Sequence, residues 1–297
     1  MSTVEEVRGF WNANPCGSRL SNEKDRFQYF KEIEARRYSV EWHIPLVARF
    51  EQFKGQRVLE IGCGMGADGR QFAQKGADYF AIDLTPQGIE LAKEQFEYFG
   101  CTGTFRVGNA EKLPFEDHFF DHIYSFGVIH HSPHSEAIVK EMFRVLKPGG
   151  TFCIMIYNRS SINYWIEIMF LRKLMRWVLY PSFMAQLLSK LLGLAEWKLI
   201  EHREFLISRK KRTHDEWVSM NTDGPNCPLA KVYNRSEALG LFKDFQDLRT
   251  DIWFFDRSHW PGIGKMLPEN FCRWLGRNWG WHRIVYGRKA YGFSAEE

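Results

Sequence analysis

The pattern of hydrophobic and polar residues divides the chain into a helical beginning and an alternating remainder. Up to about residue 54 apolar side chains recur at helical spacing, most clearly from Arg26 to Phe53, and Pro45 marks a kink or a boundary. From Arg57 onward, short apolar runs alternate with helical stretches. This alternation predicts a mostly parallel sheet with helices on both faces.

The expected elements follow from these runs. The strands are predicted at Arg57–Ile61, Tyr79–Asp83, Thr104–Gly108, Asp121–Ser125 and Thr151–Tyr157, with helices at Asp68–Lys75, Pro86–Phe99 and Ser135–Leu146. After Tyr157 the alternation stops for about 75 residues and a helical, aromatic-rich stretch follows. The alternation of helices and strands then resumes. A helix is predicted at Ser236–Phe242, capped by Asn234 or Ser236, and strands are predicted near Phe245–Phe255 and at Trp281–Lys289.

Composition narrows the class of protein. The formal net charge of +4 gives no reason to expect nonspecific nucleic-acid binding. The six cysteines show no CxxC spacing, which favours free thiols in a reducing compartment. The first residues lack a basic region followed by an apolar run, and no run of eighteen apolar residues occurs. We therefore expect a cytoplasmic protein without a signal peptide or a transmembrane helix.

A glycine-rich loop carries the first chemical signal. The strand Arg57–Ile61 runs directly into Gly62-Cys63-Gly64-Met65-Gly66 and then into a helix, so backbone amides can approach a ligand closely. Asp83 ends the next strand about twenty residues later, where a carboxylate can accept hydrogen bonds from the hydroxyls of an adenosine ribose. Because Gly64–Gly69 also spells GxGxxG, these features alone fit a nicotinamide dinucleotide as well.

The remaining motifs separate the two cofactors. Between Val58 and Tyr157 the chain resembles the class I S-adenosylmethionine-dependent methyltransferases, specifically the ubiquinone/menaquinone-biosynthesis-like (methyltransferase type 11) group; the resemblance extends loosely to Gly280–Val285. It is carried by four further segments in the family's order and spacing: Asn109–Phe115, Phe119–Ser125, Val128–His131 and Arg144–Gly150. The family usually has Asp where this chain has Asn109, so a neutral amide replaces a charged contact to adenine.

The resemblance implies a fold and a cofactor site. The fold is a Rossmann-like, mostly parallel seven-stranded sheet, with a helical cover at 1–54, a cofactor-binding core at 55–157, a helical lid at 158–235 between the fifth and sixth strands, and the rest of the sheet at 236–297. The implied S-adenosyl-L-methionine contacts are Glu60, Gly62, Gly64 and Gly66 around the methionine moiety, Asp83 at the ribose, Leu84, Asn109, Ala110 and Glu111 around adenine, and Ser125 and Phe126 after the fourth strand.

Candidates for catalysis lie at the same predicted sheet edge. Methyl transfer from a sulfonium needs alignment and sometimes a base, and His130, His131 and Tyr157 are the candidates, with positioning or core roles as the alternative. A metal is not expected, because the sequence places no cysteine or carboxylate to complete a set with the histidines. Asp68 and Arg70 are expected to be solvated residues at a helix start. Tyr29, Arg37, Tyr38 and His43 lie where related enzymes fold a helix across the cofactor, with helix packing as the alternative.

The insertion leaves several interpretations open. Ser161–Leu179 combines apolar side chains with Arg172, Lys173 and Arg176. It can therefore pack as a lid, line an apolar substrate pocket or lie on a membrane surface. The basic run Arg209–Arg212 is a solvated face or a contact for an anionic group. We expect an enzyme that methylates an O, N or C nucleophile of a small apolar or aromatic metabolite. The alternatives are an NAD(P)-dependent oxidoreductase and a non-catalytic binding protein with the same fold.

Overall fold

The protein is built around one mixed sheet with helices on both faces. The computed structural model describes residues 2–18, 21–192, 196–207, 213–224, 227–257, 260 and 264–291. Within these residues the sheet follows the order β3-β2-β1-β4-β5-β8-β7, and the short β6 pairs beside β5. The strands are β1 (Arg57–Ile61), β2 (Asp78–Asp83), β3 (Thr104–Val107), β4 (Phe120–Phe126), β5 (Leu146–Asn158), β6 (Val232–Tyr233), β7 (Gln246–Trp253) and β8 (His282–Arg288).

The order of the strands creates a place for a ligand. Strands β1 to β5 are parallel, whereas β8 runs antiparallel between β5 and β7. From β1 the chain passes outward to β2 and β3 and then returns to place β4 on the other side of β1. In open sheets a ligand binds outside the carboxyl ends of the strands where the order reverses, which here is between β1 and β4.

Helices cover both faces of the sheet because each presents one apolar side. These helices are α4 (Ala67–Gln74), α5 (Pro86–Tyr98), α6 (Ser135–Val145) and α11 (Arg235–Leu241). Thr85 caps α5 by accepting the Gly88 N–H at 3.1 Å, with Pro86 in the first turn. Asn234 rather than Ser236 caps α11, in a capping box with Glu237. The β1 residues after Arg57 are all buried, as expected of a strand covered on both faces.

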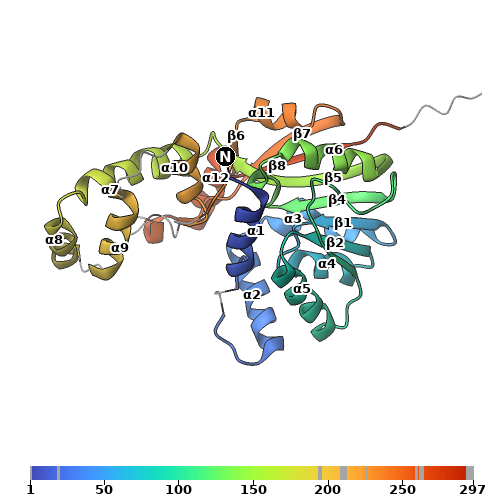
Figure 1. Ribbon diagram of the computed structural model, residues 1–297, viewed down its shortest axis with the longest axis horizontal. Helices are drawn as coiled ribbons and strands as arrows, with labels where there is room; N and C mark the ends of the chain where they lie inside the picture. The colour runs from blue at the N-terminus through green and yellow to red at the C-terminus, as the bar shows by residue number, and fades with distance from the viewer. Residues whose placement is uncertain are drawn as a thin grey trace, which may run out of the picture.

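The N-terminal segment lies against the cofactor-binding half. It comprises α1 (Val4–Ala13), α2 (Arg26–Val40), α3 (Ile44–Ala48) and the short 3₁₀ helix η1 (Phe50–Phe53), and Figure 1 shows α1 and α2 in blue beside the sheet. Arg26 of α2 donates two hydrogen bonds to Glu94 of α5, at 2.5 and 2.6 Å. Phe27 stacks on Phe99 with ring centroids 4.8 Å apart. Polar and aromatic contacts thus fasten the segment to α5.

The insertion after β5 is helical, and its first part extends away from the sheet. It forms the π-helix η3 (Asn163–Leu171), α7 (Arg172–Val178), α8 (Phe183–Leu192), α9 (Glu196–Ile207) and α10 (His214–Met220). We call η3, α7, α8 and α9 the arm, because Figure 1 shows α7, α8 and α9 projecting sideways from the rest of the molecule. Trp217 of α10 fastens its base by donating from Nε1 to the Ile168 carbonyl at 3.1 Å. The basic run at 209–212 lies outside the described residues.

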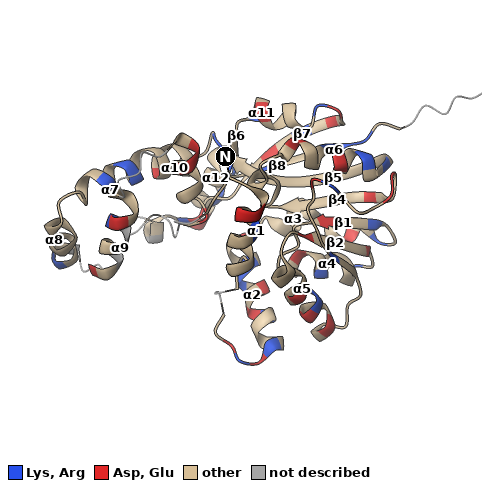
Figure 2. Cartoon of the chain, viewed as in Figure 1, with Lys and Arg blue, Asp and Glu red and all other residues tan. Residues whose placement is uncertain are grey.

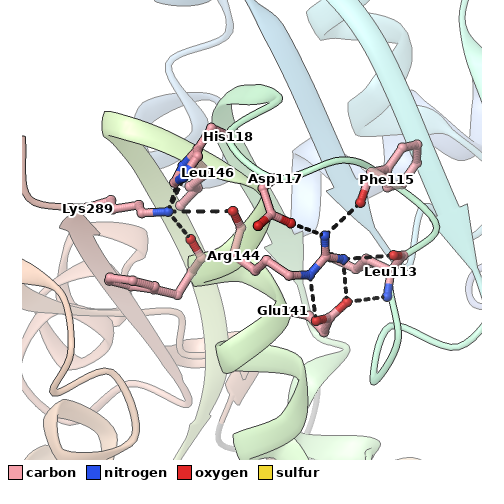
Figure 3. Close-up of polar contacts among 9 residues, drawn as sticks. Leu113, Phe115, Asp117, His118, Glu141, Arg144, Leu146 and Lys289 are labelled. Carbon is pink, nitrogen blue, oxygen red and sulfur yellow. Dashed lines mark hydrogen bonds and ion pairs between the residues drawn. The ribbon is translucent and has the colours of Figure 1, made fainter. Parts of the chain in front are cut away.

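The turn after β3 is held in place by the end of α6. Arg144 donates to the carbonyls of Leu113 and Phe115 at 2.9 and 2.8 Å and also pairs with Asp117 and Glu141 (Figure 3). Glu141 in turn accepts the Leu113 N–H at 2.7 Å. These bonds use all the directions of one guanidinium fork, so the loop that follows residues 109–111 has a fixed path.

The C-terminal strand adds a second fastening near α6. The Lys289 ammonium donates to the carbonyls of Phe143 and Leu146 at 2.6 and 2.9 Å (Figure 3). A cation at the carboxyl end of a helix satisfies carbonyls that have no partner within the helix and opposes the negative end of its dipole. The sequence did not predict this contact, nor helix α12 (Glu269–Trp279) between β7 and β8.

Candidate active site

A cavity of about 650 Å³ opens at the carboxyl ends of β1, β2, β4 and β5. Its size is within the range of about 300–1,000 Å³ that is usual for small-molecule and cofactor pockets. The predicted residues that line it are Glu60, Gly62, Gly64, Asp83, Leu84, Asn109, Ala110, Glu111, Phe126, His131 and Tyr157. Residues from α1 and α2 complete the wall, so the helical cover predicted at the N-terminus borders the cavity.

The glycine turn and the carboxylate that ends β2 form one unit. The Gly64 N–H donates to Asp83 Oδ2 at 2.9 Å, while Oδ1 accepts from the N–H and hydroxyl of Thr85 at 2.8 and 2.7 Å. Gly64 has φ +50°, and a Cβ built there meets no atom within 4 Å, so the glycine leaves open space beside the loop. These contacts fix the direction of the carboxylate before any ligand arrives.

Of three further predicted cofactor contacts, Gly62 lines the cavity, whereas Gly66 and Ser125 do not. Gly66 does not line the cavity; its Cβ would lie 3.1 Å from that of Ala92, so it allows α4 and α5 to pack closely. Ser125 is fully buried and donates to the Ile61 carbonyl at 2.8 Å, which joins β4 to β1. Gly62 does line the cavity, and a Cβ there would meet Val128 at 2.3 Å. Gly66 and Ser125 therefore shape the site without facing it.

The predicted adenine turn presents a donor. Asn109 Oδ1 accepts the Glu111 N–H at 2.9 Å, which leaves the amide NH₂ as the free polar group of that side chain. The Glu111 carboxylate accepts from the Ser132 hydroxyl at 2.7 Å. An amide donor at this position complements a ring nitrogen of adenine rather than its amino group. Asn109 thus offers a hydrogen-bond donor where an Asp would offer only acceptors.

A buried charged cluster lies behind the glycine loop, and it corrects one expectation. Asp68 is 3% exposed and accepts from Arg37 at 2.7 and 3.1 Å, from Tyr38 at 3.0 Å and from Tyr124 at 2.9 Å. It is therefore not a solvated helix-start residue. Glu60 lies nearby and accepts the Tyr79 hydroxyl at 2.5 Å. Burial, together with the charge of Asp68, raises the pKa of Glu60 well above its usual range.

Arg70 was also expected in solvent, and it is buried as well. Its guanidinium pairs with Glu34 of α2 and lies over the Phe99 ring, 3.9 Å from the centroid. Arg37 lines the cavity and pairs with both Asp68 and Glu41. The two ion pairs Arg37–Asp68 and Glu34–Arg70 hold α2 against α4, so α2 does more than pack by its apolar face.

The two adjacent histidines have different surroundings. His130 is fully buried, its ring centroid lies 3.9 Å from that of Tyr157, and it does not line the cavity, so it is not placed to contact a ligand there. His131 lines the cavity, and its Nδ1 lies 2.6 Å from the Leu229 carbonyl. Since a carbonyl only accepts, Nδ1 carries the proton and Nε2 keeps its lone pair.

Asp223 also lines the cavity, and it lies beside both His131 and Tyr157. His131 Nε2 lies 3.7 Å from Asp223 Oδ2, and the Tyr157 hydroxyl donates to Asp223 Oδ1 at 2.8 Å. Cys227 lies close by, and the ligand atoms of His131, Asp223 and Cys227 are within 4.8 Å of one another. In the structure a carboxylate and a cysteine thus do lie beside His131, contrary to the expectation from the sequence. Burial raises the pKa of the Cys227 thiol to about 12, which favours the protonated form that does not bind metal well.

Sequence reasoning missed several residues of the wall. Besides Asp223 these are Trp11, whose ring lies 5.0 Å from that of His131, Cys16 and His282. His282 Nδ1 lies 3.0 Å from Nε2 of His43, and burial lowers the pKa of His43 to about 3, so this pair is neutral. Trp11, Cys16 and Asp223 are distant in the chain from the motifs, whereas His282 lies in the loosely matched segment Gly280–Val285.

Comparison with known proteins agrees with this geometry. Residues 59–154 match the family model described as a methyltransferase domain. The chain is 30% identical over 165 residues to a ubiquinone biosynthesis O-methyltransferase of Cereibacter sphaeroides, covering 56% of this chain and 61% of that protein. It is 31% identical over 123 residues to the sterol 4-C-methyltransferase strm-1 of Caenorhabditis elegans, covering 41% and 36%. The chain thus spans less than two thirds of either relative.

A solved structure supports the fold. A SAM-dependent methyltransferase from Methanosarcina mazei superposes with a TM-score of 0.51 at 19% identity, covering 83% of this chain and 98% of that one. The acidic wall, the open glycine turn and the fixed carboxylate of Asp83 suit a cation bearing a ribose better than a pyrophosphate. Residues 59–154 of this chain are therefore a class I methyltransferase domain of the type that depends on S-adenosylmethionine.

Proposed function

We propose that the chain transfers a methyl group from S-adenosylmethionine to an O, N or C nucleophile of a small, apolar or aromatic metabolite. The proposal depends on one observation. The same cavity is lined by groups suited to the cofactor and by groups suited to remove a proton from an acceptor. The Gly64–Asp83 unit stands in the cofactor part of the wall, and the His131–Asp223–Tyr157 group stands in another part of the same wall.

The cofactor side of the cavity fits the parts of S-adenosylmethionine. Asp83 and the loop residues Gly62 and Gly64 would hold the ribose and the methionine moiety, and Leu84 with the Asn109 turn would hold the adenine. When bound, the cofactor supplies a methyl group already activated by its sulfonium. The protein then has to align the acceptor, exclude water and, for an acceptor that carries a proton, remove that proton.

His131 is suited to take such a proton. His131 lines the cavity, and its buried Nε2 atom lies 3.7 Å from the Asp223 carboxylate, which would stabilise the imidazolium that forms. As the acceptor atom bonds to the methyl carbon, the carbon–sulfur bond breaks and the sulfur keeps its electron pair, so the charge balance is preserved. Tyr157 holds Asp223 through its hydroxyl at 2.8 Å and acts as a positioning residue.

The rest of the wall favours an apolar acceptor. Apolar and aromatic side chains from four separate segments line it: Val4, Val7, Trp11, Phe126, Val128, Met155 and Phe254. The two relatives named above are described as acting on a ubiquinone precursor pathway and on a sterol, both of which suit such a wall. Because α1 contributes three of these seven side chains, we propose that residues 1–54 select the substrate, together with Asp223 from the insertion.

The test separates cofactor binding from transfer. The full chain is incubated with methyl-labelled S-adenosylmethionine and a panel of phenolic, sterol-like and fatty acceptors, and the labelled product is measured. We expect His131→Gln to lower kcat about 10²- to 10⁴-fold while the affinity for S-adenosylhomocysteine is unchanged. His134→Gln, at the exposed start of α6, is the matched control and should behave as the unaltered chain. Equal activity of the two variants would refute His131 as the base.

A further inference from the structure

The arm exposes large apolar side chains in two regular stripes. Along η3 and α7 they are Ile166, Phe170, Leu174, Trp177 and Tyr180, and along α8 they are Phe183, Leu187 and Leu191. The separations of three and four residues place each set on one side of its helix. Trp177 is 78% exposed and Leu191 70% exposed. Contiguous apolar surface of this kind marks an interaction site in a folded protein.

The stripes are not the surface that holds the arm together. The arm buries a different set of side chains between its helices: Ile168, Leu179, Ala185, Leu199 and Leu206. The cavity wall does not use the stripes either, because the only residue of the described insertion that lines the cavity is Asp223. The exposed stripes are therefore available to something outside the chain.

Positive charge accompanies the stripes. Between residues 163 and 192 there are four basic residues, Arg172, Lys173, Arg176 and Lys190, and one acidic residue, Glu167. Figure 2 shows the resulting blue on α7 and α8. Glu167 already pairs with Arg172 at 3.2 Å, whereas Lys173 and Arg176 are exposed beside Leu174 and Trp177. Over residues 163–207, which include α9, there are six basic and four acidic residues, so the excess of cations is local to η3, α7 and α8, where the stripes lie.

We infer that the arm docks on the surface of an anionic lipid bilayer, with the stripes in the interface and the basic residues on the headgroups. Tryptophan and tyrosine with interleaved Lys and Arg are the composition of interfacial helices. No helix in the described residues is long and apolar enough to cross a bilayer, so the arm lies on it rather than through it. A second copy of the chain fits less well, because a symmetric contact would bring the basic residues of both copies together.

Vesicle binding tests the inference without any methyl transfer. The full chain is sedimented with phosphatidylcholine vesicles that contain or lack 30% phosphatidylglycerol, at low and high salt. We expect binding that needs the anionic lipid and weakens with salt. Lys173→Gln with Arg176→Gln should lower the partition coefficient about 30-fold. Lys93→Gln with Lys140→Gln, two exposed residues on α5 and α6, should leave it unchanged.

A second variant tests the contribution of the apolar stripes to vesicle binding. Phe170→Ser with Trp177→Ser should lower binding at least tenfold, while the affinity for S-adenosylhomocysteine stays as in the unaltered chain and reports that the core is folded. Brominated lipids should quench the tryptophan fluorescence of the unaltered chain more than that of this variant. The inference is overturned if the chain stays unbound with both vesicles, if the two stripe variants bind like the unaltered chain, or if sedimentation velocity shows a dimer that these substitutions dissolve.

Discussion

The backbone N–H of Gly64 and the Oδ2 atom of Asp83, 2.9 Å apart, join the turn after β1 to the end of β2. The other oxygen of this carboxylate is held by Thr85, whose hydroxyl also caps α5. The carboxylate therefore has three hydrogen bonds from the protein and one of its four acceptor sites left, which under the proposed function would accept a ribose hydroxyl. A preset direction of this kind lowers the entropic cost of binding.

Removing the Thr85 hydroxyl should loosen this arrangement. Thr85→Val keeps the shape but removes the hydrogen bond to Asp83 and the helix cap, so we expect a loss of about 1 kcal/mol in stability and about tenfold weaker binding of S-adenosylhomocysteine. Thr104→Val, at the exposed start of β3, is the control. Thermal unfolding and calorimetric titration measure the two effects, and unchanged affinity would show that Thr85 does not position the carboxylate.

Gly62 should be intolerant of a side chain for a steric reason. Gly62 and Gly55 have similar positive φ values, +76° and +72°, but a Cβ meets Val128 at 2.3 Å at the former and no atom within 4 Å at the latter. Gly55→Ala should therefore show only the backbone cost, about 1–2 kcal/mol. Gly62→Ala should cost more in denaturant unfolding, and Val128→Ala should restore part of the difference. Equal costs for the two glycines would contradict the steric explanation.

The Arg37–Asp68 pair should matter for the attachment of α2. Arg37→Ala leaves a buried carboxylate without its cation, and we expect the free energy of unfolding to fall by about 3 kcal/mol. Adding Asp68→Asn should restore a good part of the lost free energy of unfolding, because it removes the unpaired buried charge. Arg57→Ala breaks an exposed pair at 3.7 Å and should change little. A double variant that is less stable than Arg37→Ala alone would be inconsistent with this reasoning.

We expect buried His122 to contribute to the pH dependence of the free energy of unfolding. Its ring lies on Phe53, and burial lowers its pKa to about 3. Because the unfolded chain binds this proton below pH about 6.5 and the folded chain does not, folding loses stability as the pH falls from about 6.5 towards 3, by about 1.4 kcal/mol per pH unit.

Substitution isolates this contribution. His122→Phe keeps a ring on Phe53 and removes the titration, so its unfolding free energy should fall less than that of the unaltered chain between pH 7.5 and 5.5. Exposed His134→Gln should keep the original dependence. Parallel profiles for the unaltered chain and His122→Phe would mean that another group sets the pH dependence.

The fold was largely predictable because its signals are local. Arg57–Ile61 has the same bounds in sequence and structure, and the other strands differ mainly at their ends. Strand β5 begins earlier than predicted, at Leu146, since Pro148 and Gly149 concealed its start. Helix α12 was missed although Pro261-Gly262 and Pro268 precede it in the sequence. The lid stays a prediction, because periodicity does not say what a helix packs against.

The site was predictable only where neighbours in the chain are neighbours in space. The glycine turn and Asp83 are linked by the geometry of one strand-helix-strand unit. Asp68 was misread because its partner Arg37 comes from a separate helix 31 residues earlier. His130 and His131 are adjacent, and only the packed structure shows which one faces the cavity. Asp223 reaches it from 66 residues beyond Tyr157.

The most direct test of the account is the affinity for S-adenosylhomocysteine, measured by titration calorimetry on the full chain and on two variants of strand β2. The account predicts one site per chain, binding about 10- to 100-fold weaker for Asp83→Ala, and unchanged binding for Asp78→Ala at the exposed start of the same strand. No binding by the unaltered chain, or equal binding by Asp83→Ala, would contradict it.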